Sequence, residues 1–267
     1  MAAEKTATIS DLANPVVKRL AKITETDENH ATHRGIAGKC MFFMVMIIAG
    51  GSIDFLLHNF FPFIPEAYEQ CVFITMPESI GAIAALVMSI GCSIAAALVV
   101  SATPVFGALS CMSYGYIIAL LANITEEFRG AALMAGVFTF SIVLAMQILF
   151  STGKINVSQK FRSIVYSILF AWVIGGGLFA LMCYIFPNFA FARAYVEENS
   201  ILSIGISMAG VVLAVLFLFI DFDNINKTVE QKLPKKYEWC AAFGLTMSII
   251  WLYFEILNLI SKLKNNN

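Results

Sequence analysis

Long apolar stretches alternate with short polar segments along the whole chain. A helix that crosses a bilayer needs about 20 predominantly apolar residues. Seven stretches meet that length: 40–61, 79–101, 104–123, 130–150, 162–187, 201–221 and 239–261. The second and third are separated only by "SATP", a tight turn after which a helix can restart at Pro104. The pattern predicts an all-α integral membrane protein with seven transmembrane helices.

Composition supports a chain whose surface faces lipid. Hydrophobic residues make up 59% of the sequence and charged residues 13%, whereas a soluble chain carries about 25% charged residues. The net charge of -1, with no basic patch that has interleaved aromatic residues, excludes nucleic acid as a partner. The first apolar stretch begins too far into the chain to be a cleavable signal peptide. We therefore expect a cytoplasmic tail at 1–38 and a transmembrane domain at 39–263.

The distribution of basic residues predicts the orientation in the membrane, because short cytoplasmic loops carry an excess of Lys and Arg. With the N-terminus inside, the tail together with Lys39 and the loops 151–162 and 222–238 hold thirteen of the seventeen basic residues, Arg162 among them. The C-terminus then lies outside, unless the last helix is re-entrant. The tail segment "NPVVKRLAKI" (14–23) is typical of a short amphipathic helix on the anionic inner leaflet, and equally of a disordered basic tail.

Enzyme and cofactor constellations are mostly absent from the sequence. Three histidines are too few for a zinc site built from several of them, and the six cysteines show no C-x-x-C spacing. We therefore predict neither a cofactor nor enzymatic activity.

The remaining candidates are ionisable groups within or beside the spans. An acid inside a membrane costs a few kcal/mol, so it marks a functional site by default. The candidates are Asp54, His58, Asp221, Asp223, Glu238 and Glu255. Asp54 and His58 lie four residues apart and share a helix face. Asp223 is interpreted as an interfacial residue that helps to end the sixth helix.

Three segments bring a known family into view: "IDFDNINKTVEQKLPKKYEWCAAFGLTMSIIWLYFEILNLISKL", "NPVVKRL" and "TGKINVSQKFRSIV". They resemble the bacterial branch of the transmembrane Bax inhibitor motif family, and the resemblance covers nearly the whole chain. It implies a bundle with the last helix at its centre, in the bacterial cytoplasmic membrane. It further implies a pH-sensitive calcium leak channel, gated by two acids that share a proton.

The resemblance assigns the two gating acids to Asp221, through "IDFDNI", and to Glu255, through "LYFEILNL". Glu255 replaces the aspartate of the family. Family members can also carry an arginine in the second span that latches to the acidic pair, and the second span of this chain has none.

Two carboxylates close together in a low dielectric cannot both ionise cheaply, so such a pair retains a proton that belongs to both. Protonated, the pair would bridge the sixth and seventh helices; deprotonated, it would offer hard oxygen ligands to Ca²⁺. Competing pairings stay open, because Asp221 lies near one end of its helix and Glu255 far along the next. Asp221 could pair with Glu238, and Glu255 with Asp54 or His58.

Three functions follow from these observations. The first is a pH-sensitive calcium leak channel whose partners are the lipid bilayer, Ca²⁺ and protons. The second is a non-conducting regulator that binds another membrane protein, such as a membrane protease. The third, least supported, is an intramembrane aspartyl hydrolase, for which a glycine-flanked catalytic aspartate is missing.

Overall fold

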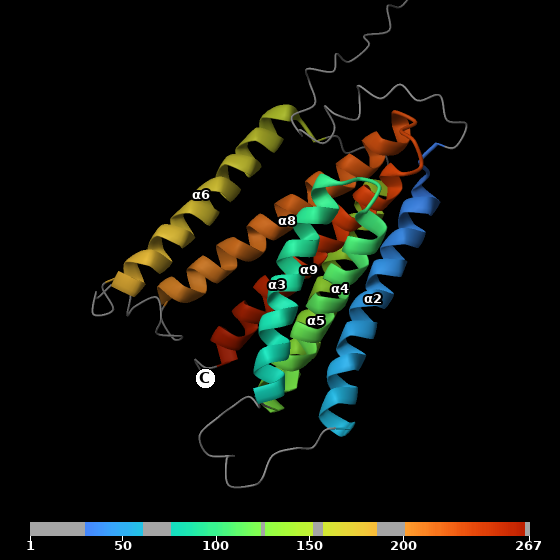
Figure 1. Cartoon of the computed structure of the whole chain (residues 1–267). Helices are drawn as coiled ribbons and strands as arrows, with labels where there is room; N and C mark the ends of the chain where they lie inside the picture. Colours follow the sequence, from blue (N-terminus) through green and yellow to red (C-terminus); the bar gives the residue numbers. More distant parts are fainter. Residues whose placement is uncertain (1–29, 61–75, 124–125, 152–156, 186–200, 265–267) are drawn as a thin grey trace, which may run out of the picture.

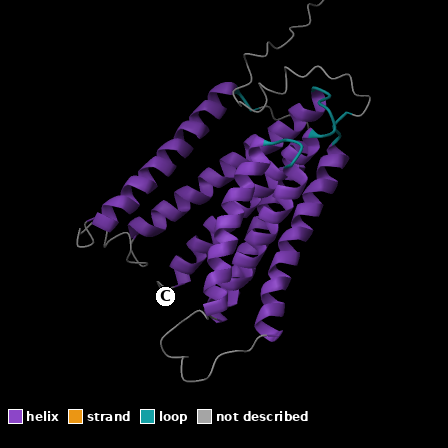
Figure 2. Ribbon diagram, in the orientation of Figure 1, coloured by secondary structure: helices purple, strands orange, loops and turns teal. Residues whose placement is uncertain are grey.

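The described part of the chain is a bundle of long helices (Figures 1 and 2). The computed structural model describes residues 30–60, 76–123, 126–151, 157–185 and 201–264. Its helices are α2 (His33–Phe60), α3 (Met76–Leu98), α4 (Thr103–Asn123), α5 (Glu126–Ser151), α6 (Gln159–Ile185), α8 (Ile201–Glu230) and α9 (Tyr237–Lys264). All seven are long and apolar enough to cross a membrane. The prediction of seven transmembrane helices is confirmed, whereas segment 14–23 lies outside the described residues.

Helix boundaries agree with the hydropathy pattern in most places and depart from it by well over a turn in two. The turn between α3 and α4 lies where "SATP" predicts it, and the buried Thr103 hydroxyl donates a hydrogen bond of 2.9 Å to the carbonyl of Ala96. The first departure is α2, which begins at His33 instead of near residue 40. The second is α8, which continues to Glu230 instead of ending near residue 221. The interpretation of Asp223 as a residue that ends the helix is therefore wrong.

The last helix, α9, lies at the centre of the bundle, as expected (Figure 1). It packs against α2, α4, α5 and α8, and its candidate span is the most buried of the seven. Side chains such as Leu252, Ile256 and Leu257 are almost wholly enclosed. By contrast, α6 lies at the edge of the bundle, where it packs against α8 and leaves most of its apolar side chains on the surface.

The described parts of the basic segments, residues 30–39, 157–162 and 222–238, gather at one end of the bundle. The backbone N–H of Ala31, just before α2, donates a 2.8 Å hydrogen bond to the carbonyl of Leu233 in the loop between α8 and α9. Arg162, near the start of α6, forms an ion pair with Asp223 near the end of α8. α9 is an unbroken helix of 28 residues that carries the chain to the opposite end.

The loop between α8 and α9 begins with a Schellman-type cap. The N–H of Leu233 bonds to the carbonyl of Thr228, and the N–H of Lys232 bonds to that of Val229. Lys232 carries the positive φ (50°) that this cap requires and that glycine adopts without steric cost.

We expect Lys232→Gly to stabilise the protein by about 1 kcal/mol, because it removes the strain of a side chain in the left-handed region. The measurement is thermal unfolding in detergent micelles, with Lys235→Gly in the same loop as the control. A melting temperature that rises no more for Lys232→Gly than for the control would contradict the prediction.

Candidate functional site

The seam between α8 and α9 carries both acids to which the resemblance points. The two helices run antiparallel, so that Asp221 of α8 lies opposite Gly244 of α9 and Glu255 of α9 lies opposite Gly210 of α8. Each carboxylate thus faces a glycine of the other helix. A Cβ at Gly210 would collide with the Glu255 carboxyl group, so this glycine makes room for the acid.

Asp221 lies at the edge of a cavity. The hydroxyl of Ser248 on α9 donates a hydrogen bond to its carboxylate. The cavity has a volume of about 460 Å³ and lies between α3, α8 and α9. Its polar lining comprises Ser93, Asp221, Asn224, Thr228, Tyr237 and Cys240. Hydroxyl and amide oxygens of this kind suit a hydrated cation or a chain of water molecules that leads to the carboxylate.

Glu255 is half-buried in the same seam, farther along α9. The indole N–H of Trp251, one turn earlier on the same helix, donates a 2.9 Å hydrogen bond to its carboxylate. Beyond it, the amide of Asn258 donates to the Ser207 hydroxyl (3.3 Å), and the ammonium of Lys262 donates to the same hydroxyl (2.8 Å). The seam is therefore polar around Asp221 and again from Trp251 to the far end of α9, and the stretch between is lined mainly by apolar side chains such as Leu213, Leu218 and Leu252.

The structure does not bring Asp221 and Glu255 together. Gly244, opposite Asp221, and Glu255 are eleven residues apart on α9, which is about 16 Å along a helix. Two carboxylates so far apart neither share a proton nor form the close dyad of an aspartyl hydrolase. Among the described residues, no group of three or more His, Cys, Asp and Glu is placed to hold a metal ion.

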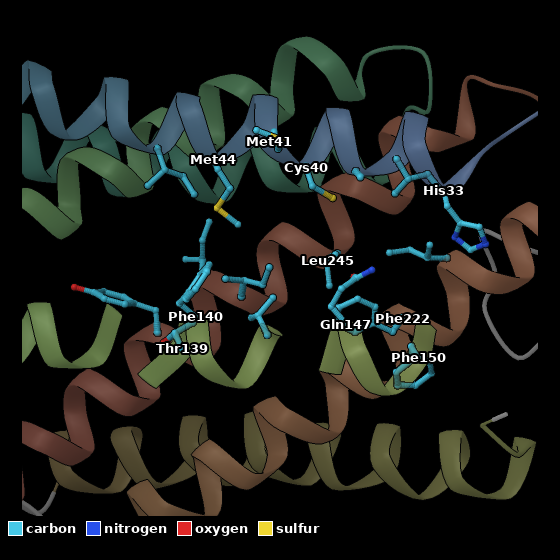
Figure 3. Close-up of a pocket in the computed structure, with 18 of the residues that line it drawn as sticks. His33, Cys40, Met41, Met44, Thr139, Phe140, Gln147, Phe150, Phe222 and Leu245 are labelled. Carbon is cyan, nitrogen blue, oxygen red and sulfur yellow. The ribbon is translucent and has the colours of Figure 1, made fainter. Parts of the chain in front are cut away.

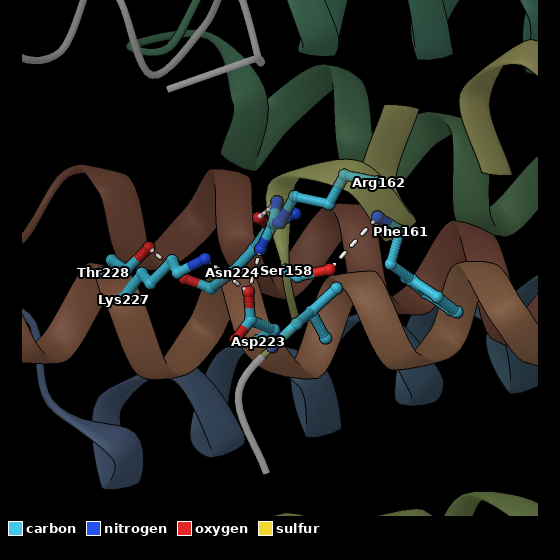
Figure 4. A network of polar contacts seen from close by, with 8 residues as sticks. Ser158, Phe161, Arg162, Asp223, Asn224, Lys227 and Thr228 are labelled. Atoms are coloured by element: carbon cyan, nitrogen blue, oxygen red, sulfur yellow. Dashed lines mark hydrogen bonds and ion pairs between the residues drawn. The ribbon is translucent and has the colours of Figure 1, made fainter. Parts of the chain in front are cut away.

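Asp223, two residues after Asp221, is buried in a different network (Figure 4). The guanidinium of Arg162 donates to its carboxylate and also, at 2.6 Å, to the side-chain oxygen of Asn224. The ammonium of Lys227, one turn along α8, lies 2.7 Å from the same carboxylate. The backbone N–H of Val157 completes the set at 3.1 Å. Asp223 therefore joins the start of α6 to α8.

Glu238, near the start of α9, is fully buried and bound to α2. Lys39 forms an ion pair with its carboxylate, and the backbone N–H of Thr32 donates to it at 2.9 Å. The alternative pairing of Glu238 with Asp221 is therefore not formed.

At the other end of α2, Asp54 is buried and accepts a 2.8 Å hydrogen bond from Asn123. The side chain of His58 lies outside the described residues.

Several partners of the acids escaped the sequence analysis. Arg162 and Lys39 entered it only as basic residues that set the orientation, and Ser248, Trp251 and Lys262 were not singled out. The spacing of four between Trp251 and Glu255, and between Asp223 and Lys227, could have predicted those two contacts, because such pairs face one another on a helix. The ion pairs of Arg162 and Lys39 join residues 61 and 199 positions apart, and no local pattern signals them.

Comparison with known proteins assigns the whole of this architecture to one family. The sequence model of the family described as Bax inhibitor 1 like matches residues 14–265. No curated protein and no solved structure matches the chain.

Proposed function

We propose that this chain, which belongs to the Bax inhibitor 1-like family, is a pH-sensitive leak channel for Ca²⁺ and other cations. Its path would follow the seam between α8 and α9, with Asp221 and Glu255 as the groups that bind protons or cations at its two polar ends. The observation that carries the proposal is the position of Asp221, at the edge of a polar cavity and hydrogen-bonded to a neutral hydroxyl.

The partners of the acids separate two roles. Asp223 and Glu238 are each neutralised by a basic side chain, Arg162 and Lys39 respectively. Such buried ion pairs hold helices together and leave no charge for an incoming cation. Asp221 and Glu255 instead accept hydrogen bonds from the neutral Ser248 and Trp251. Arg162 and Lys262 act on these two carboxylates electrostatically from farther away, and a proton or a cation can still bind to them.

The distance between the two acids changes the expected gating mechanism. In place of one pair that shares a proton, the seam would hold two separate binding sites, Asp221 and Glu255, about 16 Å apart. A single carboxylate with a few neutral oxygens binds Ca²⁺ weakly, and weak sites in series suit a leak because the ion must also leave each one. At acidic pH both carboxyls are protonated and attract no cation; as the pH rises they ionise. Flux should therefore increase with pH.

The surroundings of the channel follow from the same observations. The gathering of basic segments at one end of the bundle supports an orientation with that end, and the N-terminus, in the cytoplasm. The family resemblance supports the bacterial cytoplasmic membrane as the location. Labelling of single introduced cysteines from either side of sealed vesicles tests the orientation.

Measurement of Ca²⁺ influx into proteoliposomes loaded with a calcium dye, at a series of pH values, tests the proposed function. We expect Asp221→Asn and Glu255→Gln each to reduce the flux above neutral pH by about tenfold, the equivalent of roughly 1.4 kcal/mol of lost cation stabilisation. Because the two binding sites are separate, the reductions in flux of the two single variants should multiply in the double variant. The rise of the flux with pH should also become smaller in each variant, by the same factor as the flux itself.

Gly91→Ala serves as the control, because a Cβ at Gly91 meets no other atom within 4 Å and its flux should equal that of the wild type. If the flux of the double variant is no lower than that of either single variant, the two acids act as a coupled pair and not as separate sites. Absence of flux at every pH from folded protein would contradict the channel proposal. The non-conducting regulator would then become the leading function, and its partner another membrane protein.

A further inference from the structure

A large apolar cavity, lined also by α8 and α9, lies between α2 and α5 (Figure 3). Its volume is about 910 Å³, within the range of about 300–1,000 Å³ that is typical of ligand pockets. Both flanking helices pack on α9, which forms the floor through residues such as Leu245 and Ile249. Met41 of α2 and Phe140 of α5 line the cavity and are also 70% and 68% exposed. The cavity is therefore a groove whose mouth faces the bilayer.

The groove is polar at one end, and the rest of its walls is mainly apolar, with Thr139 and Tyr253 as the exceptions. The charged and amide side chains that line it are His33 at the start of α2, Gln147 near the end of α5, and Asn226 and Glu230 near the end of α8. All four lie at the end of the bundle where the basic segments gather. Farther in, methionine, isoleucine and aromatic side chains predominate, with Met44 and Phe140 on opposite walls in Figure 3.

The length of the groove matches one leaflet of a membrane. Its lining runs from His33 to Ile47 on α2 and from Gly136 to Phe150 on α5, which is about 21 Å along each helix at 1.5 Å per residue. Half of the hydrocarbon core of a bilayer is about 15 Å thick. The groove therefore accommodates an acyl chain of that leaflet and extends a few ångströms farther, to the level of a headgroup.

We propose that this groove is a binding site for one glycerophospholipid with an amine-bearing zwitterionic headgroup. An acyl chain lies between α2 and α5 against α9, where water molecules would find few hydrogen-bond partners. The headgroup lies at the polar end, where Glu230 carries the charge that attracts an ammonium group and His33 offers a ring N–H to the phosphate. The bilayer supplies this ligand at the mouth of the groove.

The test fills the groove with a side chain and counts the lipid that remains bound. A Cβ at Gly136 meets no atom within 4 Å, so Gly136→Phe places its ring in open space within the groove. Gly130 of the same helix is equally open and does not line the groove, so Gly130→Phe is the matched control. Full-length protein purified from phosphatidylethanolamine-containing vesicles is washed in detergent, and retained phospholipid is quantified by mass spectrometry.

We expect wild type and Gly130→Phe to retain one phosphatidylethanolamine per chain, and Gly136→Phe to retain about tenfold less, because the ring competes with the acyl chain. Added phosphatidylethanolamine should raise the melting temperature of the first two proteins and leave that of the third unchanged. Equal retention in the two phenylalanine variants would overturn the site.

A second pair keeps the test decisive if Gly136→Phe does not fold. Ala37 of α2 lines the groove and its neighbour Gly38 does not, so Ala37→Trp should lose the lipid and Gly38→Trp should keep it.

The headgroup is tested with Glu230→Gln, which should abolish the preference for phosphatidylethanolamine over phosphatidylglycerol. A wild type that retains both lipids equally would overturn the proposed headgroup contacts.

Discussion

Replacing Arg162 with methionine is expected to destabilise the protein by about 3–5 kcal/mol, the cost of removing the buried partner of Asp223 and leaving that carboxylate only the partly exposed Lys227. Arg162 is 5% exposed and Asp223 is 1% exposed, so water cannot replace the lost ion pair. Methionine keeps much of the length and apolar volume of the arginine stem, which limits the effect to the charge and its hydrogen bonds. The measurement is the free energy of unfolding in mixed micelles, from denaturant titration followed by tryptophan fluorescence.

Two further variants isolate the cause. Lys227 also contacts Asp223, but it is about one-third exposed and lies on the same helix, so Lys227→Met should cost no more than about 1 kcal/mol. The double variant Arg162→Met/Asp223→Leu removes both buried charges and should recover most of the loss. If Arg162→Met cost no more than Lys227→Met, the buried ion pair would not be what holds α6 to α8.

The outcome for Asp223 shows where hydropathy stops being informative. The apolar run of the sixth span ends at Ile220, and two acids follow it, so an end of the helix there was the natural prediction. Hydropathy reports the surroundings of a side chain only on average. It cannot tell a carboxylate that meets water from one that meets Arg162, because that arginine lies 61 residues earlier. The helix continues because the ion pair makes burial of Asp223 tolerable.

The helices themselves were predictable, because a bilayer demands about 20 apolar residues per span and leaves few alternatives. The candidate acids were predictable for a related reason, since the cost of a charge in the membrane makes each one conspicuous. What could not be read from the sequence is which acids meet. Asp221 and Glu255 lie on adjacent antiparallel helices, and a shift in helix register of a few turns would decide whether they touch. That register is fixed by contacts such as the one between Glu255 and Gly210.

Replacing Gly115 with leucine is expected to destabilise the protein by roughly 3 kcal/mol or more, the upper range for overpacking a close contact. Gly115 of α4 and Gly50 of α2 lie where the two helices cross at backbone contact. A Cβ at Gly115 would collide with the carbonyl oxygen of Ile47, and one at Gly50 with that of Met112. Because the obstacle is backbone, no change of rotamer relieves it, and the helices must separate. Small residues permit such approach in membranes, where packing replaces the hydrophobic effect as the force between helices.

Gly91→Leu on α3 is the matched control, since a Cβ there meets no other atom within 4 Å and the residue is exposed. Its free energy of unfolding, measured in the same micelles, should stay within about 0.5 kcal/mol of the wild type. The pair Gly50→Ala and Gly115→Ala adds a sharper test. Either substitution alone forces the helices apart, so the second should cost much less once the first is present. Strictly additive losses would show that the two glycines do not share one crossing point. In that case α2 and α4 would move apart separately at each glycine, which the close backbone contact at both glycines does not allow.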